Sequence, residues 1–581
     1  MGLSYISALR ITLILFLGMG LHFSEAQNVI TDLDPDAHRA YDRIFILTGG
    51  GPVGVHTSIK PYWRKDLVGL ADSSWLNLYS VVSRYDAQKI WDQNNEFVRT
   101  EPALQDPVTG MDVARYRTSG HSLWNTFYKT PSYAYEVDVH DFYLRVNPVF
   151  HLAIGRESEE GVTTFTNQRG ITLRGGVGQN VFFQTSVLDN QIRYPNYINA
   201  FTGQYGVIPG AGLYKDFTSK LFDFTQGRDF LLANAYVGIN LGKYIGVQLG
   251  HNQAFIGDGI RSLFLSGFST PVFSLRINTR IWKFHYQNIF AELAADDFHA
   301  AVNKAEPVPK KFMAAHYLSF RPSPTVSIGL FESVVFDRSN HQFELQYLNP
   351  IILYRTVESS LGSPDNVLLG LNARVDLWKS VSVYGQFILD DLSVSNILDG
   401  HLDWWGNKFG HQLGIKYLNV LSVENLDMTV EWNQVRPYTY SHYNETANYS
   451  HYKQPLAHPL GANFKEWIVS AEYPFTSRLR LSTSLYMIQK GEDADSVSFG
   501  GNVIAPNTRR PGDFGHHIGQ GVATDLVFWR TVLRFELMHD VWVDGMFLYR
   551  NKSSDLATLS QQTTLFQLGV RYNIYLRDDV F

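Results

Sequence analysis

The feature that most constrains this chain is a period of two residues, apolar then polar, that recurs from about residue 135 onward. Such a period is typical of β-strands that turn one face to an apolar medium and the other to water. It predicts about 18 strands, within a range of roughly 16 to 20. The predicted strands are 142–155, 163–175, 180–190, 228–242, 244–252, 271–282, 284–293, 312–321, 325–336, 364–378, 380–390, 406–419, 423–433, 463–474, 477–489, 518–529, 531–543 and 562–577.

The two faces of these strands differ in chemistry. Leu275, Leu371 and Val430 suit hydrocarbon, whereas Arg276 and Arg374, which point the other way, need water or hydrogen-bonding partners. The same opposition is found across the three clearest segments, where the apolar members are Phe273, Leu275, Ile277, Ile281; Val367, Leu369, Leu371, Val375, Leu377; Leu426, Met428, Val430 and Trp432.

Short and long connections alternate between the predicted strands. The short ones are 242–243, 282–283, 321–324, 379, 474–476 and 529–530; the long ones are 191–227, 253–270, 294–311, 337–363, 391–405, 434–462, 490–517 and 544–561. Barrels inserted from the periplasm show short turns on one rim and long loops on the other, and a soluble sandwich has no reason to do so. We therefore predict an all-β membrane protein, an antiparallel transmembrane β-barrel of about 18 strands whose closure leaves no open edge in lipid.

Composition agrees with a membrane barrel and excludes several other classes. Aromatic residues make up 14% of the chain, yet the mean hydropathy is only −0.15. The net charge of −6 gives nucleic-acid binding no electrostatic support. The absence of cysteine excludes a disulfide framework, a thiolate metal site and a lipid anchor on cysteine.

The first 26 residues have the pattern of a cleaved signal peptide. Arg10 precedes an apolar stretch over 11–21, and Ser24 and Ala26 supply small residues at the positions that a signal peptidase reads. The stretch is shorter than the roughly 20 residues that a spanning helix needs. We expect cleavage before Gln27 and a location in the outer membrane of a Gram-negative bacterium, with long loops extracellular and both termini periplasmic.

Residues 27–134 differ from the barrel region, predicted at 135–581. Asp34 can cap a helix that begins at Pro35, and Ser73 or Ser74 can cap a second helix. The glycines at 49–51 precede Pro52 and indicate a linker between them. We expect a small helical segment that is periplasmic or plugs the barrel.

The last predicted strand, 562–577, alternates regularly, and the chain ends with the aromatic Phe581. This arrangement resembles the C-terminal signal of proteins that the bacterial barrel assembly machinery inserts. We therefore expect that machinery as a partner during insertion, and outer-membrane lipid as a partner afterwards.

Two of the long loops carry charged and apolar side chains that suggest specific roles. In the loop over 253–270, Asp258 and Arg261 can pair with each other, or Arg261 can bind an anionic sugar or phosphate. In the loop over 337–363, apolar residues 351–353 lie among polar ones and suggest a segment that packs inward and constricts the lumen, or else simple loop packing.

The loop over 434–462 has the richest chemistry for sugars. Aromatic faces stack on sugar C–H surfaces, while tyrosine hydroxyls, histidine and asparagine bind sugar hydroxyls. A self-packed loop or the aromatic girdle at the membrane interface explains the tyrosines equally well, and the histidine spacing disfavours a metal. With Asp258 and Arg261, the candidate glycan-binding residues are Arg436, Tyr438, Tyr440, His442, Tyr443, Tyr449, His451, Tyr452 and His458.

No motif marks a catalytic nucleophile, because the Gly-x-Ser-x-Gly elbow is absent from the sequence. We predict that the protein is not an enzyme and requires neither a cofactor nor a metal.

Several separated motifs in order resemble the Wzi-type capsule assembly family, in particular its branch that includes the gliding-associated protein RemB. They are GDGIRSLFLS (257–266), YLNP (347–350), YGQ (384–386) with DD (390–391), RPYTYSH (436–442) and HPLGAN (458–463). The resemblance covers roughly residues 135–581. It implies an 18-stranded outer-membrane barrel with a helical periplasmic part, which attaches or organises capsular polysaccharide in the manner of a lectin.

The leading hypothesis is thus a non-catalytic barrel whose loops bind surface polysaccharide through many weak contacts. The alternative is a porin or substrate-specific channel, with selectivity set by Arg276, Arg280, Arg374, Asp376 and Glu431. A third hypothesis is an adhesin or a component of a gliding or secretion apparatus.

Overall fold

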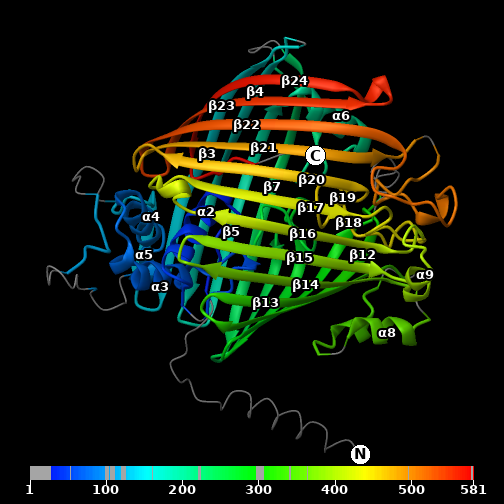
Figure 1. Cartoon of the computed structure of the whole chain (residues 1–581). Coiled ribbons are helices and arrows are strands. Elements are labelled where there is room, and N and C mark those ends of the chain that lie inside the picture. Colours follow the sequence, from blue (N-terminus) through cyan, green and yellow to red (C-terminus); the bar gives the residue numbers. More distant parts are fainter. Residues whose placement is uncertain are drawn as a thin grey trace, which may run out of the picture.

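The strands form a closed antiparallel barrel, as predicted (Figure 1). The computed structural model describes residues 28–52, 54–98, 104, 112–119, 126–159, 161–219, 224–295, 306–338, 342–351, 353–362, 364–494, 496–577 and 580–581. The predicted signal peptide, 1–26, lies outside these residues. Within them, 18 strands make the wall: β3 (Phe142–Glu157), β4 (Thr163–Val177), β5 (Val181–Arg193), β7 (Phe224–Leu241), β8 (Ile245–Asn252), β10 (Val272–Ile281), β11 (Phe284–Ala294), β12 (Lys310–Ser323), β13 (Val326–Phe336), β14 (Asn366–Leu377), β15 (Val381–Asp391), β16 (Lys408–Tyr417), β17 (Asp427–Val435), β20 (Phe464–Pro474), β21 (Leu479–Glu492), β22 (Val522–Met538), β23 (Val541–Ser554) and β24 (Gln561–Tyr572).

Pairing of the last strand with the first closes the wall. β24 runs antiparallel to the second half of β3, from Leu565 opposite Glu157 to Tyr572 opposite Phe150. The short strand β2 (Tyr135–Val139) pairs with the first half of β3. Outside the wall sheet, short pairs join β1 (Ile59–Lys60) to β9 (Phe255–Ile256) and β18 (Ser450–His451) to β19 (Gln454–Pro455), while β6 (Lys215–Ser219) pairs with β7 beyond the wall.

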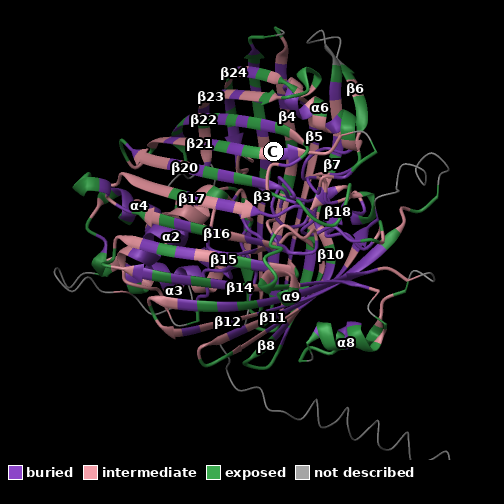
Figure 2. Cartoon of the chain, turned by 45° about the vertical axis from the view of Figure 1, so that its right-hand side comes forward, coloured by how far each residue is buried: buried purple, intermediate pink, exposed green. Residues whose placement is uncertain are grey.

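The two faces of the wall are those that the sequence period predicts. Leu371 and Val430 are exposed on the outside, whereas Arg276, Arg374 and Glu431 are buried in the lumen. Figure 2 shows the same alternation as buried and exposed bands along single strands. A barrel buries polar side chains toward its lumen because its outside faces hydrocarbon.

Connection lengths alternate around the barrel, which gives it a short-turn end and a long-loop end. The short turns include Gly242, Trp282 and Lys379, all with positive φ. The predicted turn at Trp529–Arg530 is wrong, because β22 continues through both residues to Met538 and the turn falls at 539–540.

The helices of residues 28–98, which we call the plug, lie in the barrel at its short-turn end (Figure 1). They are α2 (Pro35–Leu47), α3 (Arg64–Ser74), α4 (Val81–Asp92) and α5 (Asn95–Val98), with a 3₁₀ turn over Trp75–Asn77. Asp34 caps α2 as predicted, its side chain accepting from Asp36 N–H. The predicted cap at Ser73 or Ser74 is wrong: the Ser74 hydroxyl donates back to Leu70 C=O at the end of α3, and Ser80 caps α4.

The helices at the long-loop end are short. They are α6 (Asn196–Tyr205), α9 (Val394–Leu398) and α8 (Tyr354–Ser360), together with 3₁₀ turns over Leu345–Leu348, Asn507–Arg509 and Ala557–Leu559. A further 3₁₀ turn, Val420–Ser422, lies between β16 and β17 at the short-turn end. In the described part of the chain, no helix combines the length and apolarity that crossing a membrane requires.

The end of the chain departs from the prediction. β24 stops at Tyr572, and Asn573, with φ 53°, turns the backbone away from the sheet. Tyr575 and Arg577 then line a cavity in the lumen, and Phe581 packs against Phe201 with ring centroids 4.5 Å apart. The predicted strand over 562–577 is therefore too long by its last five residues, and the terminal aromatic does not stand in the wall.

Candidate functional site

The short-turn end of the lumen is closed by ion pairs between the plug and the wall. Asp42 accepts from Arg374 at 2.6 Å, and it also pairs with Lys416. Asp66 pairs with Arg280 at 2.5 Å. Further pairs join Arg43 to Asp427, Lys89 to Glu536, Arg39 to Glu472, Asp86 to Arg480 and Asp36 to Arg534.

Asp42 is held in its charged form by this arrangement. Burial alone would raise the pKa of its carboxyl, but the charges of Arg374 and Lys416 outweigh that effect and hold the pKa well below its ordinary value. The ionised carboxylate thus connects the plug to β14 and β16 over the whole neutral range.

The long-loop end is closed from inside by residues 253–271. The backbone N–H groups of Ile260 and Arg261 donate to the carboxylate of Glu431 at 2.7 and 3.0 Å. A Cβ on Gly259 would lie 2.4 Å from Glu431 Oε2, so this close approach requires glycine. Phe264 stacks on Phe331 of the wall at 4.7 Å between centroids.

Asp258 and Arg261 do not pair with each other. Asp258 accepts from Thr57 of the plug at 2.6 Å and from Asn372 at 3.0 Å. Arg261 donates to Glu466 at 2.9 Å and to the Val580 carbonyl at 3.1 Å. Both are buried, so their charges join plug, loop, wall and chain end rather than face solvent.

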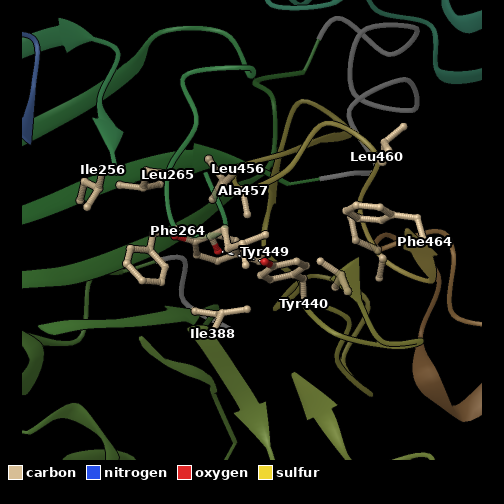
Figure 3. Packing of buried hydrophobic residues seen from close by; sticks show 14 of the residues in the cluster. Ile256, Phe264, Leu265, Ile388, Tyr440, Tyr449, Leu456, Ala457, Leu460 and Phe464 are labelled. Atoms are coloured by element: carbon tan, nitrogen blue, oxygen red, sulfur yellow. Dashed lines mark hydrogen bonds between the residues drawn. The ribbon is translucent and has the colours of Figure 1, made fainter. Parts of the chain in front are cut away.

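Most of the candidate residues in loop 436–463 are buried in loop packing (Figure 3). Tyr440 stacks on Tyr449 at 5.8 Å and donates to the Leu263 carbonyl at 2.9 Å. Tyr438 donates to the Ser498 carbonyl at 3.0 Å, which joins this loop to loop 493–521. Arg436 donates to the Asn407 carbonyl at 2.6 Å, which joins it to loop 392–407. These contacts therefore support the interpretation of this segment as a self-packed loop.

The three histidines of this loop have separate partners. His458 lies 2.8 Å from Glu466, the Ala294 N–H donates to His451 at 2.9 Å, and His442 stacks on Tyr443 at 4.2 Å. The described residues contain no cluster of three or more side chains that can hold a metal ion. Tyr452 is half-buried, and Tyr443, 52% exposed, is the candidate most open to a ligand.

A partly exposed aromatic group that sequence reasoning missed lies beside this loop: its histidine and phenylalanine are exposed and its two tryptophans are half-buried. We call His401, Trp404, Trp405 and Phe514 the aromatic platform. Phe514 is 54% exposed and packs on His401 at 4.9 Å. Arg510 lies 4.1 Å over the ring of Trp405, and the Gly515 N–H donates to Asp403 at 2.8 Å, so loops 392–407 and 493–521 form one surface. The adjacent tryptophans were visible in the sequence, but Phe514, which packs on His401, is 113 residues away from that histidine.

The described residues of loop 337–365 pack on the outside of the barrel and do not constrict the lumen. Tyr354 of α8 stacks on His316 at 3.9 Å, and Phe343 packs against Phe336. Tyr317 and Val335, their neighbours in sequence, belong to the lumen core. Because successive residues of a strand point to opposite faces, His316 and Phe336 lie on the outer face. The inward-packing prediction is therefore wrong.

The side chains that the channel hypothesis assigns to selectivity are engaged in contacts within the protein. Arg280, Arg374 and Glu431 hold the plug and the inner loop, and Arg374 also contacts Asp376 at 2.9 Å. Arg276 donates to the carbonyls of residues 252 and 253. Two lumen cavities, of about 210 and 250 Å³, lie against the plug.

This architecture is shared with known proteins. The family model of the capsule assembly protein Wzi matches residues 145–564. The solved structure of Wzi from Escherichia coli, an outer-membrane protein involved in group 1 capsule assembly and described as a carbohydrate-binding β-barrel, is 14% identical, with a TM-score of 0.56 over 95% of this chain and 100% of that one.

Porin structures are more distant. OprD from Pseudomonas aeruginosa is 11% identical with a TM-score of 0.41, covering 74% of this chain and 94% of its own. OccAB2 from Acinetobacter baumannii is 9% identical with a TM-score of 0.40, covering 74% and 97%. No curated protein sequence gave a significant match. The family match spans most of the barrel, so the chain belongs to the Wzi family of capsule assembly proteins and is an outer-membrane β-barrel.

Proposed function

We propose that the protein holds capsular or other extracellular polysaccharide at the cell surface, as a non-catalytic, lectin-like barrel. The proposal rests on one observation about the lumen. The plug and the inner loop occupy the lumen and contact its wall, whereas aromatic side chains remain exposed on the long loops. Membership of the capsule assembly family, and carbohydrate binding by the Escherichia coli relative, support the same function.

In this proposal the long-loop end faces the outside of the cell, and the short-turn end, where β3 begins and β24 ends, faces the periplasm. The C-terminus departs from the expected periplasmic position, because Phe581 packs inside the barrel against α6. The polymer contacts the aromatic platform and Tyr443, where rings are exposed and Arg510 and Glu445 supply charged groups. The buried candidates, such as Tyr438 and Arg436, would act by holding the loops in place. A contribution to gliding or to a secretion apparatus, suggested by the resemblance to the RemB branch, is compatible with this surface.

Replacing Trp404 and Phe514 together by alanine is expected to release polysaccharide into the medium. Each lost aromatic contact of 1.4 kcal/mol weakens binding about tenfold, and avidity multiplies the losses. The measurement is cell-bound against free polysaccharide in a strain that carries only the variant. Trp378→Ala, which removes an 82% exposed tryptophan at the short-turn end, is the matched control and should retain polysaccharide. Retention by the double variant, with normal amounts in the outer membrane, would count against the platform.

Purified protein in planar bilayers is expected to show no steady ohmic conductance. The plug pairs and residues 253–271 obstruct the lumen at both ends, so ions have no continuous wide path. Steady single-channel steps from the intact protein would instead favour the channel hypothesis.

A further inference from the structure

Residues 342–351 and 353–362, which we call the strap, lie against the outer wall of the barrel. In Figure 2, α8 stands outside the ring of strands. The side chains of the strap that face the wall are Tyr347, Tyr354 and Val357. They pack against the following residues of β11 to β14: Phe290, Phe312, Ala314, Val334, Phe336 and Val367. All of these wall residues belong to the outward-facing set, which in a membrane barrel contacts lipid.

Polar contacts fix the strap to this wall. The Arg355 N–H at the start of α8 donates to Glu332 Oε1 on the outer face of β13 at 3.1 Å. The Tyr286 hydroxyl, near the short-turn end of β11, donates to the Pro350 carbonyl. Tyr347 donates to Asp365 at 2.7 Å where the strap returns to β14. The strap therefore descends along the wall, well past the rim, and comes back.

Where the strap descends furthest, its outer side exposes large apolar side chains, with Gln346 and Asn349 as exposed polar neighbours. Leu345, Ile351 and Leu353 are 73%, 86% and 63% exposed, whereas the exposed residues of the returning helix α8 are polar. The wall beside it also exposes apolar side chains, among them Leu330 and Ile328 of β13 and Leu371 of β14. The apolar surface of the strap thus continues the lipid-facing belt of the barrel.

Several backbone N–H groups of the strap have acceptors within the strap, which lowers the cost of placing it in hydrocarbon. The Tyr347 N–H donates to the Glu344 carbonyl, the Ile351 N–H to the Asn349 side chain and the Thr356 N–H to the Leu353 carbonyl. His316 and Glu332, polar residues on the outer wall, are covered by Tyr354 and the start of α8. The strap therefore shields these two polar wall residues from the surroundings of the barrel.

We infer that the strap is a membrane-embedded segment whose residues Leu345, Ile351 and Leu353 contact the acyl chains of the outer membrane. The occupant of this surface is lipid, because the surface is continuous with the belt that lipid already covers. This role is separate from polysaccharide binding, which belongs to the long-loop end.

Because the chain has no cysteine, single nitroxide labels test this inference directly. Ile351→Cys and Leu353→Cys are labelled in proteoliposomes, and collision with O₂, which partitions into hydrocarbon, is compared with collision with a water-soluble nickel chelate. Leu330→Cys on the wall is the lipid-facing control, and Tyr443→Cys is the aqueous control.

The strap labels are expected to match Leu330→Cys, with O₂ collisions well above nickel collisions. Two outcomes would overturn the inference. A profile like that of Tyr443→Cys means that the strap stands in water. Low collision with both reagents means that protein covers it, either a second copy of this chain or another membrane protein.

Discussion

Replacing Asp42 by asparagine is expected to lower the free energy of unfolding by about 1.5–3 kcal/mol, because Arg374 and Lys416 lose a charged hydrogen-bond acceptor while Asp376 still pairs with Arg374. Arg374 is 2% exposed, and Lys416 shares the same carboxylate. The change should also weaken docking of the plug. Chemical denaturation in detergent micelles measures the first effect, and limited proteolysis within residues 28–98 measures the second.

Acid should remove the difference between wild type and this variant. Because the folded protein holds the pKa of Asp42 below its unfolded value, this carboxylate stabilises the protein fully above about pH 4 and loses its effect as the pH falls further. The two unfolding curves are thus expected to converge below about pH 4.

Asp216→Asn is the matched control for Asp42→Asn. Asp216 pairs with Arg228, but its side chain is 74% exposed, and such pairs contribute about 0–1 kcal/mol. Equal losses in the two variants, or a plug that resists protease in Asp42→Asn, would mean that this ion pair does not hold the plug.

The wall of the barrel was predictable because its requirement is local. A strand between lipid and a polar lumen must alternate side chains, so Leu371 and Arg374 reveal their faces without knowledge of any neighbour. The misplaced turn at Trp529 arose because real turns at Trp282 and Trp378 are also tryptophan followed by a basic residue. The period distinguishes the cases, because the outward series continues past the predicted turn: Val527, Trp529, Leu533 and Phe535 are apolar, and only Thr531 between them is polar.

The lumen contents were not predictable in the same way. Tyr440 meets Leu263, and Arg261 meets Glu466, across separations of 177 and 205 residues. Aromatic and charged composition identified the loops as chemically rich, but whether a tyrosine faces solvent or a neighbouring loop depends on packing that no local pattern encodes. The end of the chain gives the same lesson, because its alternation continues after Asn573 has left the sheet.

Arg261→Met tests whether this arginine holds the structure together or binds sugar. The guanidinium and Glu466 are 7% and 0% exposed, and the arginine also lies 5.1 Å over the ring of Tyr486. Its loss leaves the buried carboxylate of Glu466 with hydrogen bonds to His458 and Asn433 but without the charge of the arginine. We expect the free energy of unfolding to fall by about 3–5 kcal/mol, and residues 253–271 to become accessible to protease.

Arg510→Met supplies the opposite case in the same experiment. Arg510 lies over Trp405 at the long-loop end, and its partner Asp513 is 57% exposed, so its replacement should change stability by about 1 kcal/mol or less. Polysaccharide retention should fall more for Arg510→Met than its small loss of stability explains. If Arg261→Met instead keeps wild-type stability and loses polysaccharide, the inner loop contacts the polymer directly, and the division between buried scaffold and exposed binding surface is wrong.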